Sequence, residues 1–408
     1  MVPERHPTTD RVSYALVGGL VASRGVTRSL RALPWVIALV LVAGLVGPGF
    51  GRAAADPATW IVHTRTTADS DAVVHDGGIT PTAVFDSAVA GFAAPLTSAQ
   101  LGSVRRHPGV LGVERDQAGA PAEPRTTRLS AADAGGQGNW GLDRIDQRAL
   151  PLDGRHALKA TGAGVTIYVL DTGVDTAHPE FDGRAQPAFN AVDRTADDCD
   201  GHGTVVAGIA ASRLHGVAPQ AQVRSVKVLD CNGVGTLSSL LSGIDWVARN
   251  AQRPAVAVMS WSYGPSDALA AAVRSLVDDG VFVAASAGNT GADDCAALPR
   301  AVPGVTVVAS SARDDRRVTA SSTGPCVDVY APGASIKSTA ANGGVQSWSG
   351  TSMAAPHVAG VAALYKQVHG DAPSADVEKW IVDHATPGVV QGGDVGGTPN
   401  RLLYAGDL

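Results

Sequence analysis

The sequence predicts an α/β protein in which a mostly parallel β-sheet lies between layers of helices, preceded by a small α+β domain. Two observations lead to this fold class. After Trp140, short β-branched runs alternate with helix-like segments, a pattern typical of a parallel sheet covered on both faces. Before it, residues 59–117 combine apolar strand-like runs with a helix-like segment, which indicates a small βαβ-type unit.

In the larger region, strands and helices are expected to alternate. A helix is expected from Leu237, because apolar residues recur at helical spacing and Thr236 can cap the first turn. Another is expected from Ser266 or Asp267 to Gly280, where the next strand can begin directly. The expected strands are residues 164–171, 222–230, 255–262, 281–289 and 304–310.

The composition limits the class of protein. The chain has 408 residues, of which 45% are hydrophobic and 17% charged, as in packed globular proteins; disordered and fibrous classes are therefore excluded. The formal net charge is -6, so there is no global electrostatic reason to expect a nucleic-acid partner. We expect a monomer that binds no nucleic acid.

Residues 1–55 are predicted to be a signal peptide. The uncharged run from Leu33 to Phe50 follows several arginines and precedes the small residues Ala53 and Ala55, which suit a signal peptidase. The alternative is a membrane anchor, but a Gly-Pro-Gly sequence interrupts the run, which is short for a spanning helix of about 20 residues. We expect a secreted, extracellular protein with no stable membrane anchor.

Export makes the four cysteines interpretable, because disulfides persist outside the cytoplasm. Three pairings are possible, and proximity in the sequence favours Cys199 with Cys231 and Cys295 with Cys326. Buried free thiols remain the alternative. Residues 118–139 are rich in Ala, Gly and Pro and are predicted to be an exposed, easily cut linker.

Candidate catalytic residues occur where the predicted strands end and helices begin. Asp171 directly follows a buried strand, either as a turn residue or as a functional carboxylate. His202 lies between two glycines at a helix start, where it is better placed than His178, His215 or His384 to act as a base.

Ser352 directly follows Gly350 and Thr351 at the start of an apolar helix, where it is either a helix cap or a nucleophile. A serine hydroxyl needs a base, so the second interpretation requires His202 to take its proton and Asp171 to orient the imidazole. Acyl transfer also needs a donor to the oxyanion, for which Asn289 is a candidate, although a turn residue is the plain alternative.

Four motifs carry a resemblance to a known family. They are "VLDTGVDTAHPEF", "DGHGTVVAGIA", "AASAGNT" and "SGTSMAAPHVAGVAAL", in the order Asp, His, Asn, Ser. The sequence resembles the subtilisin-like serine proteases (subtilases), within them the proteinase K and aqualysin-like branch. The resemblance implies a three-layer subtilisin-like peptidase domain over residues 140–405.

The resemblance also implies the roles of single residues. Asp171 would orient His202, which would be general acid and base, and Ser352 would be the nucleophile; Asn289 and the Ser352 backbone N–H would form the oxyanion hole. The implied activity is a secreted serine endopeptidase with an acyl-enzyme intermediate and no cofactor needed for catalysis. We expect activity at neutral to alkaline pH, because the base must be unprotonated.

Residues 260–264 and 284–288 resemble the two walls that hold an extended peptide and its side-chain pocket, with the peptide pairing as an added strand. Relatives usually have Leu-Gly-Gly where this chain has "WSY", so the added side chains are expected to narrow the pocket or reshape its rim. The implied substrate-binding residues are Ser260, Trp261, Ser262, Ala285 and Gly288.

Residues 59–117 resemble an inhibitor-type propeptide, which assists folding and blocks the cleft until it is cut away. The linker of residues 118–139 would then contain the processing site, and the protein would be made as a self-inhibited precursor that processes itself. The cysteine positions resemble aqualysin-like disulfides. The expected partners are protein or peptide substrates and the protein's own propeptide as an intramolecular inhibitor.

The sequence leaves the metal content open. Ala312 stands where relatives often have a calcium-binding Asp. Asp143, Asp146 and Gln147 resemble a second calcium site, but three oxygen-bearing side chains are too few to assign it, so structural calcium is possible and unproven.

Other functions fit the sequence less well. A lipase or esterase would place its acid and His after the Ser, and only 56 residues follow Ser352. A sedolisin-type acid protease would lack the "DGHGT" base. A secreted pseudoprotease that acts as a binding module is the remaining alternative, distinguished by its failure to hydrolyse an unfolded protein.

Overall fold

A computed structural model describes residues 58–119, 139–195 and 197–408. The chain divides into two units, Met1–Ala55 and Asp56–Leu408, and the fold described below belongs to the second. The predicted signal peptide and nearly all of the predicted linker lie outside the described residues. Within the part of the chain that is described, no helix is long and apolar enough to cross a bilayer.

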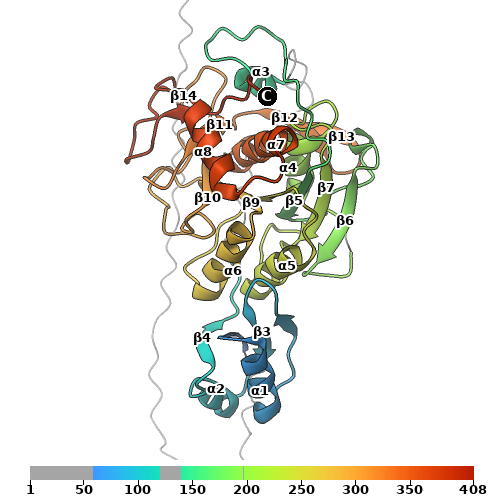
Figure 1. Ribbon diagram of the computed structural model, residues 1–408, viewed down its shortest axis with the longest axis vertical. Coiled ribbons are helices and arrows are strands. Elements are labelled where there is room, and N and C mark those ends of the chain that lie inside the picture. The colour runs from blue at the N-terminus through green and yellow to red at the C-terminus, as the bar shows by residue number, and fades with distance from the viewer. Residues whose placement is uncertain (1–57, 120–138, 196) are drawn as a thin grey trace, which may run out of the picture. The chain divides into compact units, whose positions relative to one another are not determined.

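The first described region is a four-stranded sheet with two helices (Figure 1). Its strand order is β2-β3-β1-β4, and every pair is antiparallel. The expected βαβ-type unit, which would have parallel strands, is therefore wrong. The strands β2 and β3 form a hairpin, because the short connection between them permits antiparallel pairing. The elements are β1 (Thr59–Thr64), α1 (Thr67–Gly77), β2 (Ala83–Phe85), β3 (Ala90–Pro95), α2 (Ser98–Val104) and β4 (Val110–Arg115).

The larger region is built on a nine-stranded sheet with the order β14-β15-β11-β10-β9-β8-β5-β7-β6. All pairs from β15 to β6 are parallel, and only β14 is antiparallel to its neighbour. The strands are β5 (Thr166–Asp171), β6 (Ala185–Asn190), β7 (Gln222–Lys227), β8 (Ala255–Met259), β9 (Phe282–Ser286), β10 (Val305–Ser311), β11 (Val329–Pro332), β14 (Thr386–Pro387) and β15 (Arg401–Leu402), with a separate hairpin of β12 (Ile336–Ala340) and β13 (Gly344–Trp348).

Alternate residues of the central strands enter two separate cores. In β5, Ile167 and Val169 pack in the core beneath one helix layer, whereas Tyr168 and Leu170 pack in the core beneath the other. Because both faces are covered, the strand is apolar throughout. The first layer contains α3 (Trp140–Ile145), α4 (His202–Ala211), α7 (Thr351–His369) and α8 (Ser374–His384), and the second contains α5 (Leu237–Asn250) and α6 (Asp267–Asp278) (Figure 1).

The predicted starts of the helices in the second layer agree with the structure. Thr236 accepts a hydrogen bond from Ser239 N at the start of α5, and Ser266 accepts one from Leu269 N at the start of α6. Each side chain satisfies a backbone donor that the helix itself leaves free. The fold is thus the expected mostly parallel sheet between helices.

A partly buried carboxyl group lies between β10 and β11. Asp328 Oδ2 accepts a hydrogen bond from Val307 N at 2.8 Å. Burial, assisted by the charge of Glu378, raises the pKa of Asp328 from 3.8 to about 7. The folded state therefore holds a proton that the unfolded chain releases between about pH 4 and pH 7, and the free energy of unfolding falls as the pH rises through that window.

We predict that Asp328→Asn removes this loss of stability. The variant should match the wild type near pH 4 and exceed it near pH 8 by up to about 4 kcal/mol, because a neutral amide needs no ionisation in the folded state. Urea unfolding at both pH values measures the difference. Equal pH dependence of the two proteins would contradict the assignment to Asp328.

Candidate active site

Four predicted residues lie at two strand ends and two helix starts. Asp171 is the last residue of β5, and Asn289 follows β9 by three residues. His202 is the first residue of α4, and Ser352 is the second residue of α7. In a parallel α/β sheet, the carboxyl ends of the strands and the first turns of the following helices meet at one edge, which is where ligands bind.

Asp171 and His202 form a buried pair. His202 Nδ1 lies 2.7 Å from Asp171 Oδ1, and both side chains are almost completely excluded from solvent. The same carboxylate oxygen accepts a hydrogen bond from Thr172 N at 2.7 Å. The carboxylate therefore holds the proton on Nδ1 and leaves Nε2 as the ring nitrogen that can act as a base.

Glycines permit the close approach of α4 to β5. Gly201 adopts a φ of 95°, in the left-handed region that glycine enters without strain. A Cβ on Gly203 would lie 2.0 Å from Gly173 O and 3.1 Å from Asp171 Cβ. The first turn of α4 thus lies directly against the end of β5, which brings the imidazole of His202 to the carboxylate.

Ser352 is not a helix cap. The N-cap of α7 is Gly350, with a φ of 141° and no side-chain cap hydrogen bond. Ser352 Oγ instead donates to Ser260 O at 3.1 Å, while Ser260 Oγ donates to Ser352 O at 3.2 Å. The cap interpretation is therefore wrong, because the hydroxyl points to the segment after β8 and not to the amides of its own helix.

The side-chain amide of Asn289 has a hydrogen-bond partner at its oxygen but none at its nitrogen among the described residues. Its Oδ1 accepts a hydrogen bond from Thr351 N at 3.1 Å, which fixes the amide beside the residue that precedes Ser352. Its Nδ2 is buried and has no hydrogen-bond partner among the described residues. A buried donor without a partner is costly and calls for an explanation, such as a ligand atom that binds there.

Asp198 organises the backbone around this pair. Its carboxylate accepts hydrogen bonds from Thr172 Oγ1 and Gly201 N at Oδ1, both at 2.8 Å. It accepts two more at Oδ2, from Thr204 N at 2.8 Å and Thr204 Oγ1 at 2.6 Å. Because Thr172 follows Asp171 and the other partners flank His202, one buried carboxylate connects both members of the pair.

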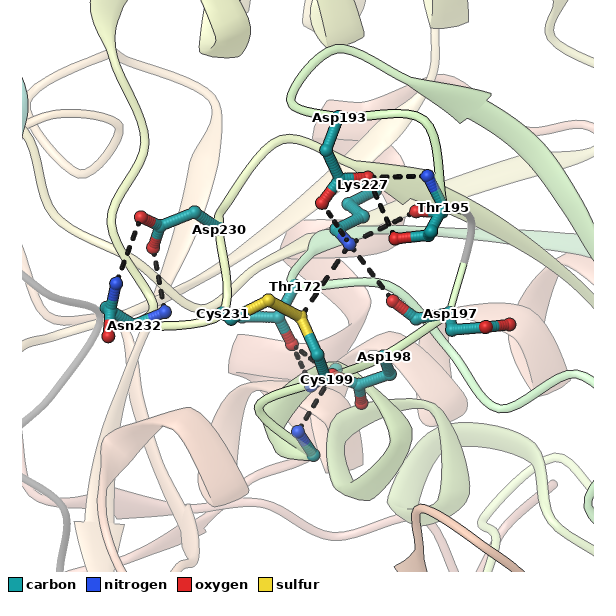
Figure 2. The surroundings of a disulfide bond; sticks show 12 residues. Thr172, Asp193, Thr195, Asp197, Asp198, Cys199, Lys227, Asp230, Cys231 and Asn232 are labelled. Carbon is teal, nitrogen blue, oxygen red and sulfur yellow. Dashed lines mark hydrogen bonds and ion pairs between the residues drawn. A yellow bond between two sulfur atoms is a disulfide. The ribbon is translucent and has the colours of Figure 1, made fainter.

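The loop that leads to Asp198 is held by a buried lysine and a disulfide (Figure 2). Lys227 Nζ, whose side chain is 1% exposed, donates to Asp193 Oδ2 at 2.9 Å and to Thr195 O and Asp197 O at 3.2 and 3.0 Å. Hydrogen bonds from Asn190 and Lys227 hold the pKa of Asp193 well below its usual range. The charge of Lys227 is thus compensated mainly by this loop.

Both disulfides join cysteines that are close in sequence. Cys199, which directly follows Asp198, is bonded to Cys231 (Figure 2). Cys295 is bonded to Cys326. The alternative of free thiols is therefore wrong, since all four cysteines are paired. The first bridge fixes the loop that carries Asp198 to the end of β7.

The segment after β8 differs from expectation. Trp261 is 1% exposed, and its indole N–H donates to Leu170 O at 3.0 Å. Its side chain packs with Tyr263 in the core beneath α5 and α6, so it does not form a pocket rim. Side chains alternate along the segment, and Ser260 and Ser262 therefore face the opposite side. For Trp261, the expectation that the added side chains narrow the pocket or reshape its rim is therefore wrong.

Of the other two predicted wall residues, Ala285 lies on the neighbouring strand β9 and Gly288 lies two residues after its end. Ala285 is in β9 and packs in the same core as Trp261. Gly288 has a φ of 97°, and its N–H donates to Thr351 Oγ1 at 3.1 Å. This contact ties the second wall to the first residue of α7, next to Ser352.

No metal cluster is evident in residues 58–119, 139–195 and 197–408, where no group of three or more His, Cys, Asp and Glu side chains could hold an ion. Asp143 Oδ2 accepts from Gly154 N, Asp146 Oδ2 from Ala157 N, and Gln147 Oε1 from Asp153 N. These oxygens, for which the sequence left calcium binding open, bind the backbone of the following loop, whereas Asp143 Oδ1 is buried without a hydrogen-bond partner among the described residues.

Sequence reasoning missed Asp198 and Thr172. A signal for Asp198 is present, since an Asp shortly before a helix start is typical of a residue that binds the free amides of the first turn. No signal in the sequence indicates that the same carboxylate reaches Thr172, because that contact depends on the packing of α4 against β5.

Comparisons with known proteins agree with this architecture. Residues 162–401 match the subtilase family, and residues 53–119 match the peptidase inhibitor I9 family. A solved cold adapted subtilisin-like serine proteinase superposes with a TM-score of 0.64 at 46% identity, covering 66% of this chain and 99% of that one.

Two curated relatives are similar over most of the chain. Alkaline serine exoprotease A of Vibrio alginolyticus is 46% identical over 326 residues, which are 79% of this chain and 60% of that relative. The extracellular serine proteinase of a Thermus species (strain Rt41A) is 41% identical over 325 residues, 79% of this chain and 77% of the relative. The chain thus spans less than two thirds of the length of the Vibrio protein.

The fold and the strand-end site define the class of subtilisin-like serine proteases. This chain belongs to the subtilase family and carries an N-terminal region of the peptidase inhibitor I9 type.

We predict that Asp198→Ala lowers kcat by about 10² with a smaller change in KM, because loss of the carboxylate frees the first turn of α4 and displaces the imidazole. Steady-state hydrolysis of a peptide substrate measures this change. Asp197→Ala, an exposed position in the same loop, is the matched control and should retain full kcat. An unchanged kcat in Asp198→Ala would contradict the positioning role.

Proposed function

We propose that the protein is a secreted serine endopeptidase with Asp171, His202 and Ser352 as its catalytic triad and Asn289 as an oxyanion donor. The observation that carries the proposal is the buried, unpartnered Asn289 Nδ2, fixed by Thr351 N at the start of the helix that bears Ser352. A binding module has no need for such a donor, whereas acyl transfer requires one for the tetrahedral oxyanion.

The proposed reaction follows from the buried Asp171–His202 pair. His202 Nε2 takes the proton of Ser352 Oγ as the oxygen attacks the peptide carbonyl carbon, and Asp171 stabilises the imidazolium. The carbonyl oxygen becomes an oxyanion that accepts hydrogen bonds from Asn289 Nδ2 and the Ser352 backbone N–H. The C–N bond then breaks as His202 returns the proton to the leaving amine, and water hydrolyses the acyl-enzyme by the same steps.

The tail of the propeptide region supports an inhibitory role. Gln117 O accepts hydrogen bonds from Leu237 N at 3.0 Å and Tyr263 Oη at 3.1 Å, and Gly119 N donates to Gly235 O at 2.8 Å. Ala118 forms an antiparallel bridge with Thr236. The tail thus pairs as an added strand with residues 235–237, and Tyr263 of the first wall contacts it through its hydroxyl group; we propose that substrate peptides bind in the same way.

Carboxylates attach the rest of the propeptide region to the helices of the second layer. Asp116 accepts from Ser238 N and Ser238 Oγ at 2.9 and 2.7 Å, and Glu114 accepts from Ala268 N at 3.1 Å. The donors lie in the first turns of α5 and α6, where free amides and the helix dipole favour a negatively charged partner. Removal of this region would expose both helix starts.

Asp245 of α5 makes the reciprocal contact. Its Oδ1 accepts hydrogen bonds from the backbone N–H groups of Asp86, Ser87 and Ala88 at 3.1, 2.8 and 2.8 Å. The loop between β2 and β3 is therefore bound through its backbone. Together these contacts support a precursor whose propeptide folds against the peptidase domain of residues 140–405 and is cut within residues 118–139.

We predict that only the wild type is shortened after secretion. The intact mass of the wild-type protein should correspond to a terminus between Gln117 and Asn139, whereas Ser352→Ala should keep its propeptide because it lacks the nucleophile. Retention of the propeptide by both proteins, or trimming of both, would contradict self-processing. Hydrolysis of an unfolded protein by the trimmed wild type, but not by the variant, separates a protease from a pseudoprotease.

We predict that Asn289→Ala lowers kcat by about 10² to 10³ with little change in KM, since the lost hydrogen bond forms only in the transition state. The exposed Asn250 at the end of α5 provides the control variant Asn250→Ala, which should keep wild-type kinetics. A rise in KM at constant kcat would show that Asn289 serves ground-state binding only.

A further inference from the structure

A buried ion pair lies where the two proposed substrate walls meet. The side chain of Arg300 is 0% exposed, and its Nη1 and Nη2 donate to Asp294 Oδ2 and Ser262 Oγ. Ser262 belongs to the first wall. The guanidinium therefore contacts the face of that wall that Trp261 and Tyr263 leave free, because their side chains enter the core.

Backbone pairing brings Arg300 to this place. Tyr263 N donates to Leu298 O at 3.0 Å, and Leu298 N donates to Tyr263 O at 2.9 Å. The two residues form an antiparallel bridge. The segment that ends in Arg300 is thus hydrogen-bonded to the first wall. This pairing fixes the backbone from which the side chain of Arg300 extends.

The same ion pair packs closely against Gly288 of the second wall. A Cβ on Gly288 would lie 2.6 Å from Arg300 Nη1 and 2.6 Å from Asp294 Oδ2. Only a glycine leaves room for both groups at this position, where the φ of 97° also favours glycine. The guanidinium therefore spans the distance between the walls, with Ser262 on one side and Gly288 on the other.

The ion pair is not easily displaced. Arg300 is fully buried, while the side chain of Asp294 is 28% exposed, so the carboxylate compensates the guanidinium from the solvent side. Separation of the two would leave a buried charge without its partner, which costs more than a substrate side chain can recover by apolar contact. The pair thus behaves as a fixed part of the pocket.

We propose that Arg300 and Asp294 close the side-chain pocket and make the enzyme select small uncharged residues immediately before the scissile bond. This inference rests on the proposed function, in which the two walls hold the substrate. Large side chains meet the guanidinium before they are fully inserted. The ion pair is neutral as a whole, so neither an acidic nor a basic side chain finds an unpaired opposite charge that would offset its own desolvation.

The test uses the mature enzyme and a series of peptides that differ only at the residue before the cleaved bond: Ala, Phe, Glu or Lys. Wild type should have a kcat/KM at least about 10-fold higher for Ala than for Phe or for either charged residue. Arg300→Ala should lower the Ala-to-Phe ratio at least about 10-fold, because the pocket becomes deeper.

Asp294→Asn provides a second variant that keeps the side-chain volume. It removes the negative charge that Asp294 places beside the guanidinium, and the Glu-to-Ala ratio should rise at least about 10-fold. The matched control is Asp314→Asn, which removes the carboxylate of the exposed Arg316–Asp314 pair and should leave every ratio unchanged. Ser262→Ala, which removes one contact of the guanidinium without removing the charge, should lower the Ala-to-Phe ratio by a smaller factor than Arg300→Ala.

The inference is overturned if wild type prefers Phe to Ala, or if the ratios of both Arg300→Ala and Asp294→Asn stay within threefold of wild type. If Arg300→Ala does not fold, Asp294→Asn alone decides the test: a Glu-to-Ala ratio within threefold of wild type then overturns the inference. Failure of the proposed function has a different result: wild type would then hydrolyse no peptide of the series and would equal Ser352→Ala.

Discussion

The contact between the first turn of α4 and the end of β5 is the constraint on which the site depends. Gly203 and Gly173 O approach so closely that no side chain fits between them, and this approach sets the 2.7 Å hydrogen bond of His202 to Asp171. Asp198 then connects both elements through four hydrogen bonds. The imidazole is therefore positioned by backbone packing, before any substrate contact is made.

Buried cations hold the loops around this contact. Lys227 binds the loop that carries Asp198, and Arg144 joins α3 to the loop after β10 through two hydrogen bonds to Asp315 at 2.7 and 3.0 Å. Arg300 does the same between the proposed substrate walls. In each case a charge that is costly to bury is compensated by a carboxylate, so the loop has one favourable conformation. Such pairs give the site its geometry more than they add net stability.

The described propeptide contacts use the same chemistry in a removable form. Asp116 and Glu114 bind the free amides at the starts of α5 and α6, and Asp245 binds three amides of the loop between β2 and β3. The tail then pairs with residues 235–237 as a strand. A region attached mainly through backbone groups and carboxylates can fold with the enzyme, and under the proposed self-processing it leaves once the linker is cut.

Much of the fold could be predicted because its signals are local. The strands β5 and β7 to β10 are short runs that contain β-branched residues, and Thr236 and Ser266 mark two helix starts. The strands β6, β11, β14 and β15 were missed. They are short or lie toward the sheet edges, where pairing with a neighbour and not the local pattern makes a strand. The hairpin of β2 and β3 was missed for the same reason.

The sequence by itself determined the layered fold, the proximity of the cysteine pairs and the candidate residues Asp171, His202, Ser352 and Asn289, because motif spacing and periodicity are properties of the chain. Only the tertiary structure decided which way side chains point. It turned Trp261 into the core and brought Arg300 between the walls, since both outcomes depend on segments packed together from distant parts of the chain. Contacts of that kind have no local signal, as the hydrogen bond between Thr172 and Asp198 also shows.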